Sequence, residues 1–135
     1  MAQSEKLDNK IAQLKKAVHN FEKVMQIDLF SPSEMITDLI RNGQIQKFEY
    51  CTELLWKVTK AFLEEKHGSN SKSPKNVFRD FFENGYIDEM ACEKIILMVD
   101  DRNLLSHIYN EDYFEKVHKH LPEHLKLMQL VVDKL

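Results

Sequence analysis

The sequence is poor in residues that interrupt helices and in residues that anchor zinc. Of its 135 residues only three are glycine, three are proline and two are cysteine. Cys51 and Cys92 lack close cysteine or histidine neighbours at a zinc-site spacing, which excludes a cysteine-based zinc motif. We expect both thiols to stay reduced and to pack as small apolar groups.

Long hydrophobic runs are absent as well. No segment approaches the ~20 apolar residues that span a bilayer, and the first ten residues lack the apolar core of a secretion signal. These absences exclude a membrane protein and predict a cytoplasmic one. A net charge of −3 excludes a surface that coats nucleic acid along its whole extent. Any contact with RNA therefore requires a local basic cleft.

The apolar residues that are present recur at helical rather than alternating spacing. From about Ser4 to Gln26 they step by four and three residues alternately, which predicts a helix with a coiled-coil-like seam formed by Leu7, Ile11, Leu14, Val18, Phe21 and Met25. After it, "SPSE" at 31–34 is a capping box with proline at the first helical position. It predicts a short helix that Asn42-Gly43 closes.

The rest of the chain predicts four more helices. A long one runs from about Gln44 to Lys66 and ends in the polar loop "HGSNSKS". Ser73-Pro74 starts a short one. Asp88 caps a long helix that reaches about residue 106 or 107, and Asn110 caps the last, with a bend expected at Pro122.

These segments predict an all-α fold. Four long helices with one or two short ones, joined by brief loops, are typical of an up-down bundle. The length of 135 residues supports one hydrophobic core, so we expect residues 1–135 to form a single domain.

The octapeptide "RNLLSHIY" (102–109) departs from this regular pattern. The apolar seam of its helix, formed by Cys92, Ile96 and Val99, continues into polar Asn103 and Ser106, with Arg102 beside them. A second apolar surface, formed by Leu97, Leu104, Leu105 and Ile108, predicts that this helix is wedged between neighbours. A buried arginine without an anionic partner costs several kcal/mol. Either Arg102 joins an internal network with Asp101, Glu49 or Glu53, or it lines a cleft or a subunit interface.

Helical geometry separates the polar side chains of this segment. Arg102 and Tyr109 are seven residues apart and share a face, whereas Arg102 and His107 lie roughly 140° apart on an ideal helix. One straight helix cannot bring all of them together. Either the helix ends near Ser106 and His107 swings round, or a second copy of the chain completes the site across a two-fold axis.

The same segment resembles the Arg-x4-His-x-Tyr signature of HEPN domains, which are small helical bundles found in prokaryotic toxin-antitoxin pairs, and Asn103 fits this pattern too. The segment "IQKFEYCTELLWKVTKAFLEE" and the run "DDRNLLSHIYNED" resemble one HEPN branch, the nucleotidyltransferase substrate-binding protein family. The resemblance covers most of the chain. It implies a homodimer with the two motif helices near the axis, and a minimal nucleotidyltransferase as partner.

The resemblance also implies roles for individual residues. Many HEPN proteins are metal-independent endoribonucleases, so Arg102 and His107 are the expected catalytic pair, acting on RNA or a nucleotide in the dimer cleft without a cofactor or metal. Tyr109 is the expected acceptor of nucleotidyl groups that silence the ribonuclease. The alternative is a non-catalytic subunit that binds a nucleotide or substrate for the nucleotidyltransferase.

The chemistry of these side chains agrees with the implied roles. An imidazole can take the proton of a ribose 2′-hydroxyl, and a guanidinium can stabilise the charge that grows on the phosphate. Asn103 would orient phosphate or base and Asp101 would hold the arginine, while Ser106 completes the polar end of the seam.

Two other groups of polar residues are weaker candidates. Lys57 lies four residues after Glu53, which favours an intrahelical ion pair over a place on the rim of a nucleotide groove. His120 and His124 have the spacing of metal ligands on a helix, beside His118. No well-placed carboxylate accompanies them in the sequence and Pro122 interrupts the turn, so we expect no metal site there.

Overall fold

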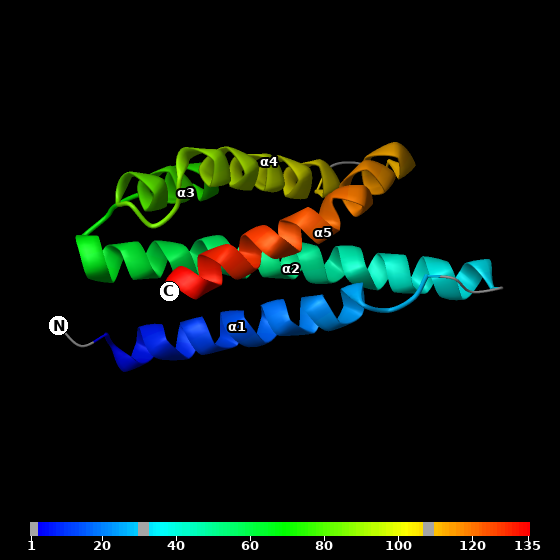
Figure 1. The fold of residues 1–135 in the computed structure, drawn as a ribbon, viewed down its shortest axis with the longest axis horizontal. Helices are drawn as coiled ribbons and strands as arrows, with labels where there is room; N and C mark the ends of the chain where they lie inside the picture. Colours follow the sequence, from blue (N-terminus) through cyan, green and yellow to red (C-terminus); the bar gives the residue numbers. More distant parts are fainter. Residues whose placement is uncertain (1–2, 30–32, 107–109) are drawn as a thin grey trace.

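The computed structural model describes residues 3–29, 33–106 and 110–135. These residues form five helices and no strand: α1 (Glu5–Met25), α2 (Glu34–His67), α3 (Pro74–Glu83), α4 (Glu89–Leu105) and α5 (Glu111–Lys134). Four of the helices are long and α3 is short, so the predicted all-α class is confirmed (Figure 1). None of the helices in these three ranges is both long and apolar enough to cross a membrane.

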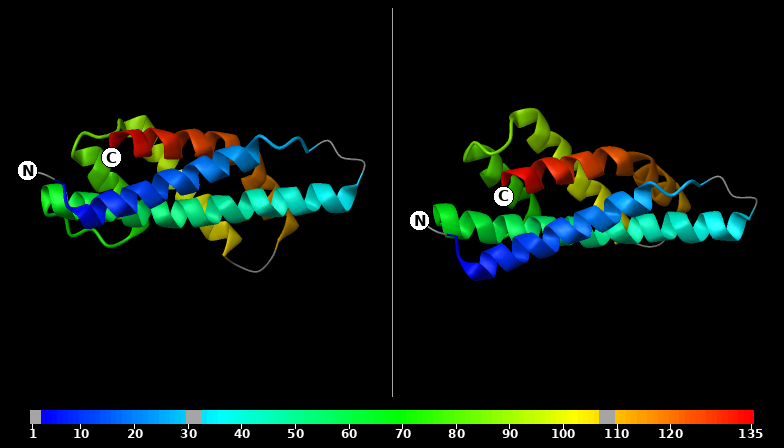
Figure 2. Two further views of the ribbon diagram at one scale, coloured as in Figure 1. Left: turned by 90° about the horizontal axis from the view of Figure 1, so that it is seen from below. Right: turned by 60° about the horizontal axis from the view of Figure 1, so that its bottom comes forward.

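The four long helices alternate in direction along the bundle, so that α1 begins and α5 ends at the same end of the molecule (Figure 1). Helix α2 lies in the middle and packs against each of the other four helices. Helix α1 lies along one side of it, α3 and α4 lie on another, and α5 crosses it between α1 and α4 (Figures 1 and 2). The up-down arrangement follows from the short connections between successive helices.

A single cluster of buried apolar side chains joins the five helices. Its largest members include Phe21, Phe48, Phe78 and Phe81, each with essentially no exposed surface. Burying such a side chain stabilises the fold by ~1.5–3 kcal/mol relative to leaving it in water. The two cysteines, both free thiols, belong to this cluster as predicted. Burial raises the pKa of Cys51 to about 12, so its thiol is not a nucleophile at neutral pH.

Polar N-caps set the starts of three long helices, and two of them, Asp88 and Asn110, are the caps that the sequence predicts. Ser4 accepts a hydrogen bond from the backbone N–H of Leu7 at 3.1 Å, and Asp88 accepts one from Ala91 at 2.8 Å. The Asn110 side chain accepts from the first turn of α5 at 2.9 Å. Each cap satisfies a backbone donor that the helix itself leaves unpaired, which is why these polar residues mark the boundaries so well.

The predicted break at Asn42-Gly43 is wrong, because α2 runs without interruption from Glu34 to His67. Gly43 does not adopt the left-handed conformation that ends a helix, whereas Gly68 does, with φ of 63°. Gln44 and Ile45 follow directly and are buried in the core. Their burial outweighs the ~1 kcal/mol that glycine costs inside a helix relative to alanine.

Substitution by alanine should change the free energy of unfolding in opposite directions at Gly43, inside α2, and at Gly68, its C-terminal cap. We expect Gly43→Ala to raise the free energy of unfolding by ~0.5–1 kcal/mol, since the added methyl meets nothing within 4 Å and stiffens the helix. Gly68→Ala is the matched control and should lower it by ~1–2 kcal/mol, because an L side chain is strained at a positive φ. Urea unfolding followed by circular dichroism measures both. A destabilised Gly43→Ala protein would contradict a continuous α2.

Candidate functional site

In the last turn of α4, Asp101 and Asn103 line one pocket beside α5, whereas Arg102 between them faces α2. Successive residues of a helix are ~100° apart. Asp101 therefore faces α5, where it is buried, and Arg102 faces α2. Asn103 is exposed and lines a pocket between α4 and α5. The polar residues that end the apolar seam therefore contact different helices and do not form one hydrogen-bond network.

Arg102 is held loosely by α2. Its Nε lies 3.9 Å from Oε2 of Glu53, which is an ion pair but too long for a hydrogen bond. This Nε is buried and has no hydrogen-bond partner among the residues described. The expectation that Asp101 holds the arginine is wrong, because adjacent residues on a helix diverge. Of the partners considered from the sequence, Glu53 forms the ion pair with Arg102, and the carboxylate of Glu49 also interacts with the charge of Arg102.

Glu53 also contacts Lys57, whose Nζ lies 3.2 Å from its Oε1. The predicted intrahelical ion pair is confirmed, and Lys57 remains exposed. One carboxylate therefore bridges two cations from different helices. Burial tends to raise the pKa of Glu53, but the nearby Trp56 side chain, the hydrogen bond from Lys57 and the charges of Lys57 and Arg102 bring it below its ordinary value. At the neighbouring Glu49, burial dominates and the pKa is raised.

Helix α4 ends at Leu105, and Ser106 is its C-terminal cap. The hydroxyl of Ser106 donates to the carbonyl oxygen of Asn103 at 2.8 Å and is exposed. The expectation that the helix ends near Ser106 is confirmed, which removes the constraint of one straight helix through the motif. The predicted catalytic His107 and the predicted acceptor Tyr109 lie outside the described residues.

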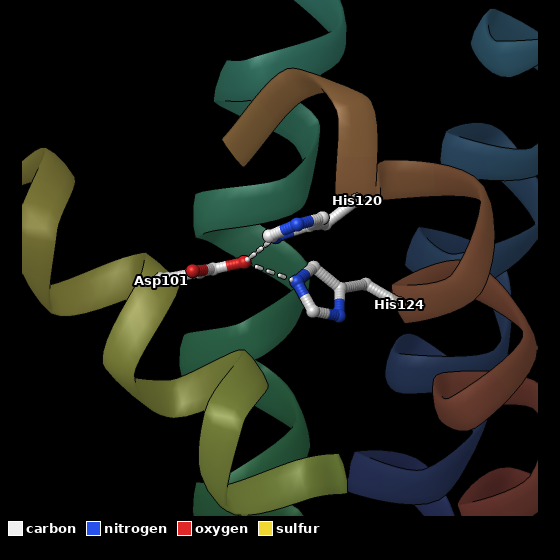
Figure 3. Close-up of side chains that lie close together, drawn as sticks. All are labelled: Asp101, His120 and His124. Carbon is white, nitrogen blue, oxygen red and sulfur yellow. Dashed lines mark hydrogen bonds and ion pairs between the residues drawn. The ribbon is translucent and has the colours of Figure 1, made fainter. Parts of the chain in front are cut away.

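Asp101 joins α4 to α5 through two imidazoles (Figure 3). Its Oδ2 lies 2.7 Å from Nδ1 of His120 and 2.7 Å from Nε2 of His124. Burial raises the pKa of this carboxyl, but hydrogen bonds from the two histidines and their charges outweigh burial and bring the pKa below its usual value. His124 also stacks on the core residue Phe48 with ring centroids 5.2 Å apart.

Two features of the chain make this cluster hard to predict from the sequence: a proline lies inside α5, and the carboxylate is distant in the chain. Helix α5 continues through Pro122, so His120 and His124 keep their one-turn spacing. The carboxylate that seemed to be missing comes from Asp101, which lies 19 residues before His120 in the chain. No local sequence pattern predicts a contact between two antiparallel helices whose residues lie 19 positions apart in the chain. His118, the third histidine of this stretch, bonds Gln44 of α2 instead at 2.6 Å.

A pocket of about 550 Å³ opens beside this cluster between α4 and α5. Its apolar wall includes Leu97, Leu104 and Leu127, and its polar groups include Asn103 and Lys116. The prediction that α4 is wedged between neighbours is wrong at Leu97, whose exposed fraction is 61%. Met90, two turns earlier on the same helix, is 65% exposed. One apolar face of α4 is therefore not covered by the described part of this chain.

A family model described as nucleotidyltransferase substrate binding protein like matches residues 7–135. The chain belongs to this family. A crystal structure of a protein from Thermus thermophilus is 33% identical, with a TM-score of 0.77 over 89% of this chain and 96% of the other. No curated protein matches the sequence.

The bundle is also similar to HEPN toxins. A tri-AMPylated HEPN toxin of Shewanella oneidensis, solved in complex with an MNT antitoxin, is 19% identical and has a TM-score of 0.75 over 98% of this chain and 97% of the other. A toxin-antitoxin structure with AMP-PNP is 17% identical, with a TM-score of 0.74 over 98% of both chains. Likeness at these identities shows that the chain has the HEPN fold, as the sequence predicted.

Proposed function

We propose that this protein is the HEPN-type partner of a minimal nucleotidyltransferase in a toxin-antitoxin-like pair, and that it is a metal-independent endoribonuclease. The observation that carries this proposal is the position of Arg102. It lies at the end of α4, half-buried, with a long ion pair to Glu53, the charge of Glu49 nearby and its Nε unbonded among the described residues. A guanidinium in this state is available to an incoming phosphate.

The partner assignment is supported by membership of the substrate-binding family and by the structural relatives. The S. oneidensis toxin is complexed with an MNT antitoxin, and a second relative is a toxin-antitoxin pair with AMP-PNP. A nucleotidyltransferase that uses ATP is therefore the partner we expect for this chain.

In the proposed reaction, His107 takes the proton of a ribose 2′-hydroxyl as its oxygen attacks the adjacent phosphorus. The bond from phosphorus to the 5′-oxygen breaks and that oxygen takes up a proton from solvent, which leaves a 2′,3′-cyclic phosphate and a 5′-hydroxyl end. Arg102 stabilises the charge on the non-bridging oxygens. Lys57 shares Glu53 with Arg102 and would contact the RNA backbone, while Asn103 and Ser106 border the same helix end.

A homodimer would complete the site. The exposed apolar residues Met90 and Leu97 of α4 form a face that no other described helix covers. Exposed large apolar side chains grouped on one helix indicate an interaction surface. A second copy packed on α4 would cover them and bring the two motif segments to one cleft across the axis.

Tyr109 is the proposed point of control. Attack of its phenol oxygen on the α-phosphorus of ATP would form a phosphodiester and release pyrophosphate, and the phenol proton would pass to solvent. The attached nucleotide would place a negative charge near Arg102 and compete with an RNA phosphate. The tri-AMPylated state of the S. oneidensis toxin supports this proposal, since it shows a HEPN toxin that carries such groups.

The second candidate function is a non-catalytic subunit that binds a nucleotide or substrate for the nucleotidyltransferase. The pocket of about 550 Å³ favours it, because apolar Leu97, Leu104 and Leu127 lie beside Lys116 and Asn103. That mixture suits a base and its phosphate. Binding of AMP without any cleavage of RNA would favour this alternative.

The dimer predicts a mass of two chains by light scattering at micromolar concentration. Leu97→Glu should shift the protein to the monomer, because it places a charge on the face that the second copy buries. Tyr50→Glu, at an exposed position on α2, is the matched control and should stay dimeric. A monomeric wild-type protein would refute the dimer.

If the protein is a ribonuclease, His107→Ala and Arg102→Ala should each lower the rate of RNA cleavage by ~10²–10⁴-fold. Circular dichroism should show that both variants remain folded. Arg102→Lys should recover only part of the activity, because a lysine cannot form two parallel bonds to phosphate. His19→Ala removes an exposed imidazole from α1 and should cleave normally. Cleavage should persist in EDTA and leave cyclic phosphate or 3′-phosphate ends.

Undiminished cleavage by purified His107→Ala protein would place the activity elsewhere. No cleavage of any cellular RNA by the wild-type protein would leave the binding subunit as the function.

If Tyr109 is the acceptor, the protein should gain the mass of a nucleotidyl group when it is incubated with its cognate nucleotidyltransferase, ATP and magnesium. Intact-mass measurement should find the increment on the wild-type chain and not on Tyr109→Phe, which lacks the acceptor oxygen. Tyr113→Phe, four residues later at the start of α5, is the control and should be modified like the wild type. Equal increments on wild type and Tyr109→Phe, or none on either, would remove Tyr109 from the mechanism.

A further inference from the structure

The cluster of Asp101, His120 and His124 has the composition of a metal site. Three donor atoms, one carboxylate oxygen and two imidazole nitrogens, lie within 4.8 Å of one another (Figure 3). Two of them come from one face of α5, one turn apart, and the third comes from the facing helix α4. Two histidines and a carboxylate are a recurring ligand set for divalent transition metals, which bind neutral imidazole well.

The charge balance of the cluster favours a cation. Asp101 is 6% exposed, and no lysine or arginine in the described ranges pairs with it. The lysine Lys94, which lines the same pocket, pairs with Glu123, and Asp100 is paired with Lys75. A buried carboxylate is normally compensated by a cation, a metal or several strong donors. Among the residues that the structure describes, only the two imidazoles bond this carboxylate, and the three groups can also bind one ion together.

Two of the three donors are already fixed. His124 is 5% exposed and stacked on Phe48, and Asp101 is buried beside it. The side chain of His120 is 46% exposed, so it can move without disturbing the core. The N···O distances of 2.7 Å would need to widen to ~3.3 Å around a tetrahedral ion with bonds of ~2.0 Å. Movement of His120 and a small adjustment at the carboxylate would open the cluster.

We propose that Asp101, His120 and His124 bind one divalent transition-metal ion, for which Zn²⁺ is the probe. The pocket beside the cluster leaves room for water or an exchangeable ligand at the remaining coordination position. The ion would link the end of α4 to α5. It takes no part in the proposed RNA cleavage, because Arg102 leaves α4 toward α2 and not toward this cluster.

The test is direct measurement of binding. Purified protein is freed of metal with a chelator, dialysed and titrated with Zn²⁺ by calorimetry, and the bound metal is then counted by mass spectrometry. We expect one Zn²⁺ per chain. His120→Ala and Asp101→Asn should each weaken binding by at least ~10-fold, since each removes one of three protein ligands. Co²⁺ should give the intense visible absorption of a four- or five-coordinate ion in the wild type and not in these variants.

His19→Ala is the matched control, because its imidazole is exposed on α1, outside the cluster, and it should bind Zn²⁺ like the wild type. Circular dichroism in EDTA checks that each variant is folded, and His120→Ala decides the matter if Asp101→Asn is not. Less than half an equivalent of Zn²⁺ on the wild type, or unchanged affinity in folded His120→Ala, would overturn the proposal. RNA cleavage that persists in EDTA leaves it untouched, so the two proposals fail separately.

Discussion

The packing of α2 against all four other described helices is the constraint on which the rest of the structure depends. Its buried stripe includes Phe48, Leu55 and Phe62, and apolar area removed from water there stabilises every neighbouring helix at once. The same helix carries Glu53, so the core that fixes α2 also fixes the anion that faces Arg102. The position of the candidate site is therefore a consequence of core packing rather than of local sequence.

Two carboxylates beside the last turn of α4, Glu53 of α2 and Asp101 of α4 itself, have different environments. Glu53 and Arg102 are partly exposed, so solvent screens their attraction and the pair stabilises the fold by at most ~1 kcal/mol. Asp101 is buried, and its hydrogen bonds to two histidines hold α4 against α5. Such buried charge-assisted bonds are stronger than exposed ones. Arg102 can thus exchange its partner for a phosphate, whereas Asp101 loses stability on releasing its donors unless a metal ion takes the place of the hydrogen bonds.

The divergence of neighbouring side chains gives one helix end several tasks. Arg102 is the residue of the proposed cleavage, and Asn103 lines the pocket between α4 and α5. Asp101 anchors the proposed metal. Helix α4 stops at Leu105, and Ser106 caps it. The candidate polar site thus lies where the apolar seam of α4 ends. The exposed face of the same helix carries Met90 and Leu97.

The sequence by itself determined the all-α class, the caps at Asp88 and Asn110, the buried thiols, the Glu53–Lys57 pair and the family. Each of these depends on residues close together in the chain or on a continuous motif. The sequence misjudged Gly43, since a local cost of ~1 kcal/mol is overcome by the burial of the residues that follow. Only the tertiary structure decided that Arg102 faces Glu53 and that Asp101 meets His120 and His124. Those contacts depend on which faces of α2, α4 and α5 oppose one another, and the burial of all their apolar stripes together sets that orientation.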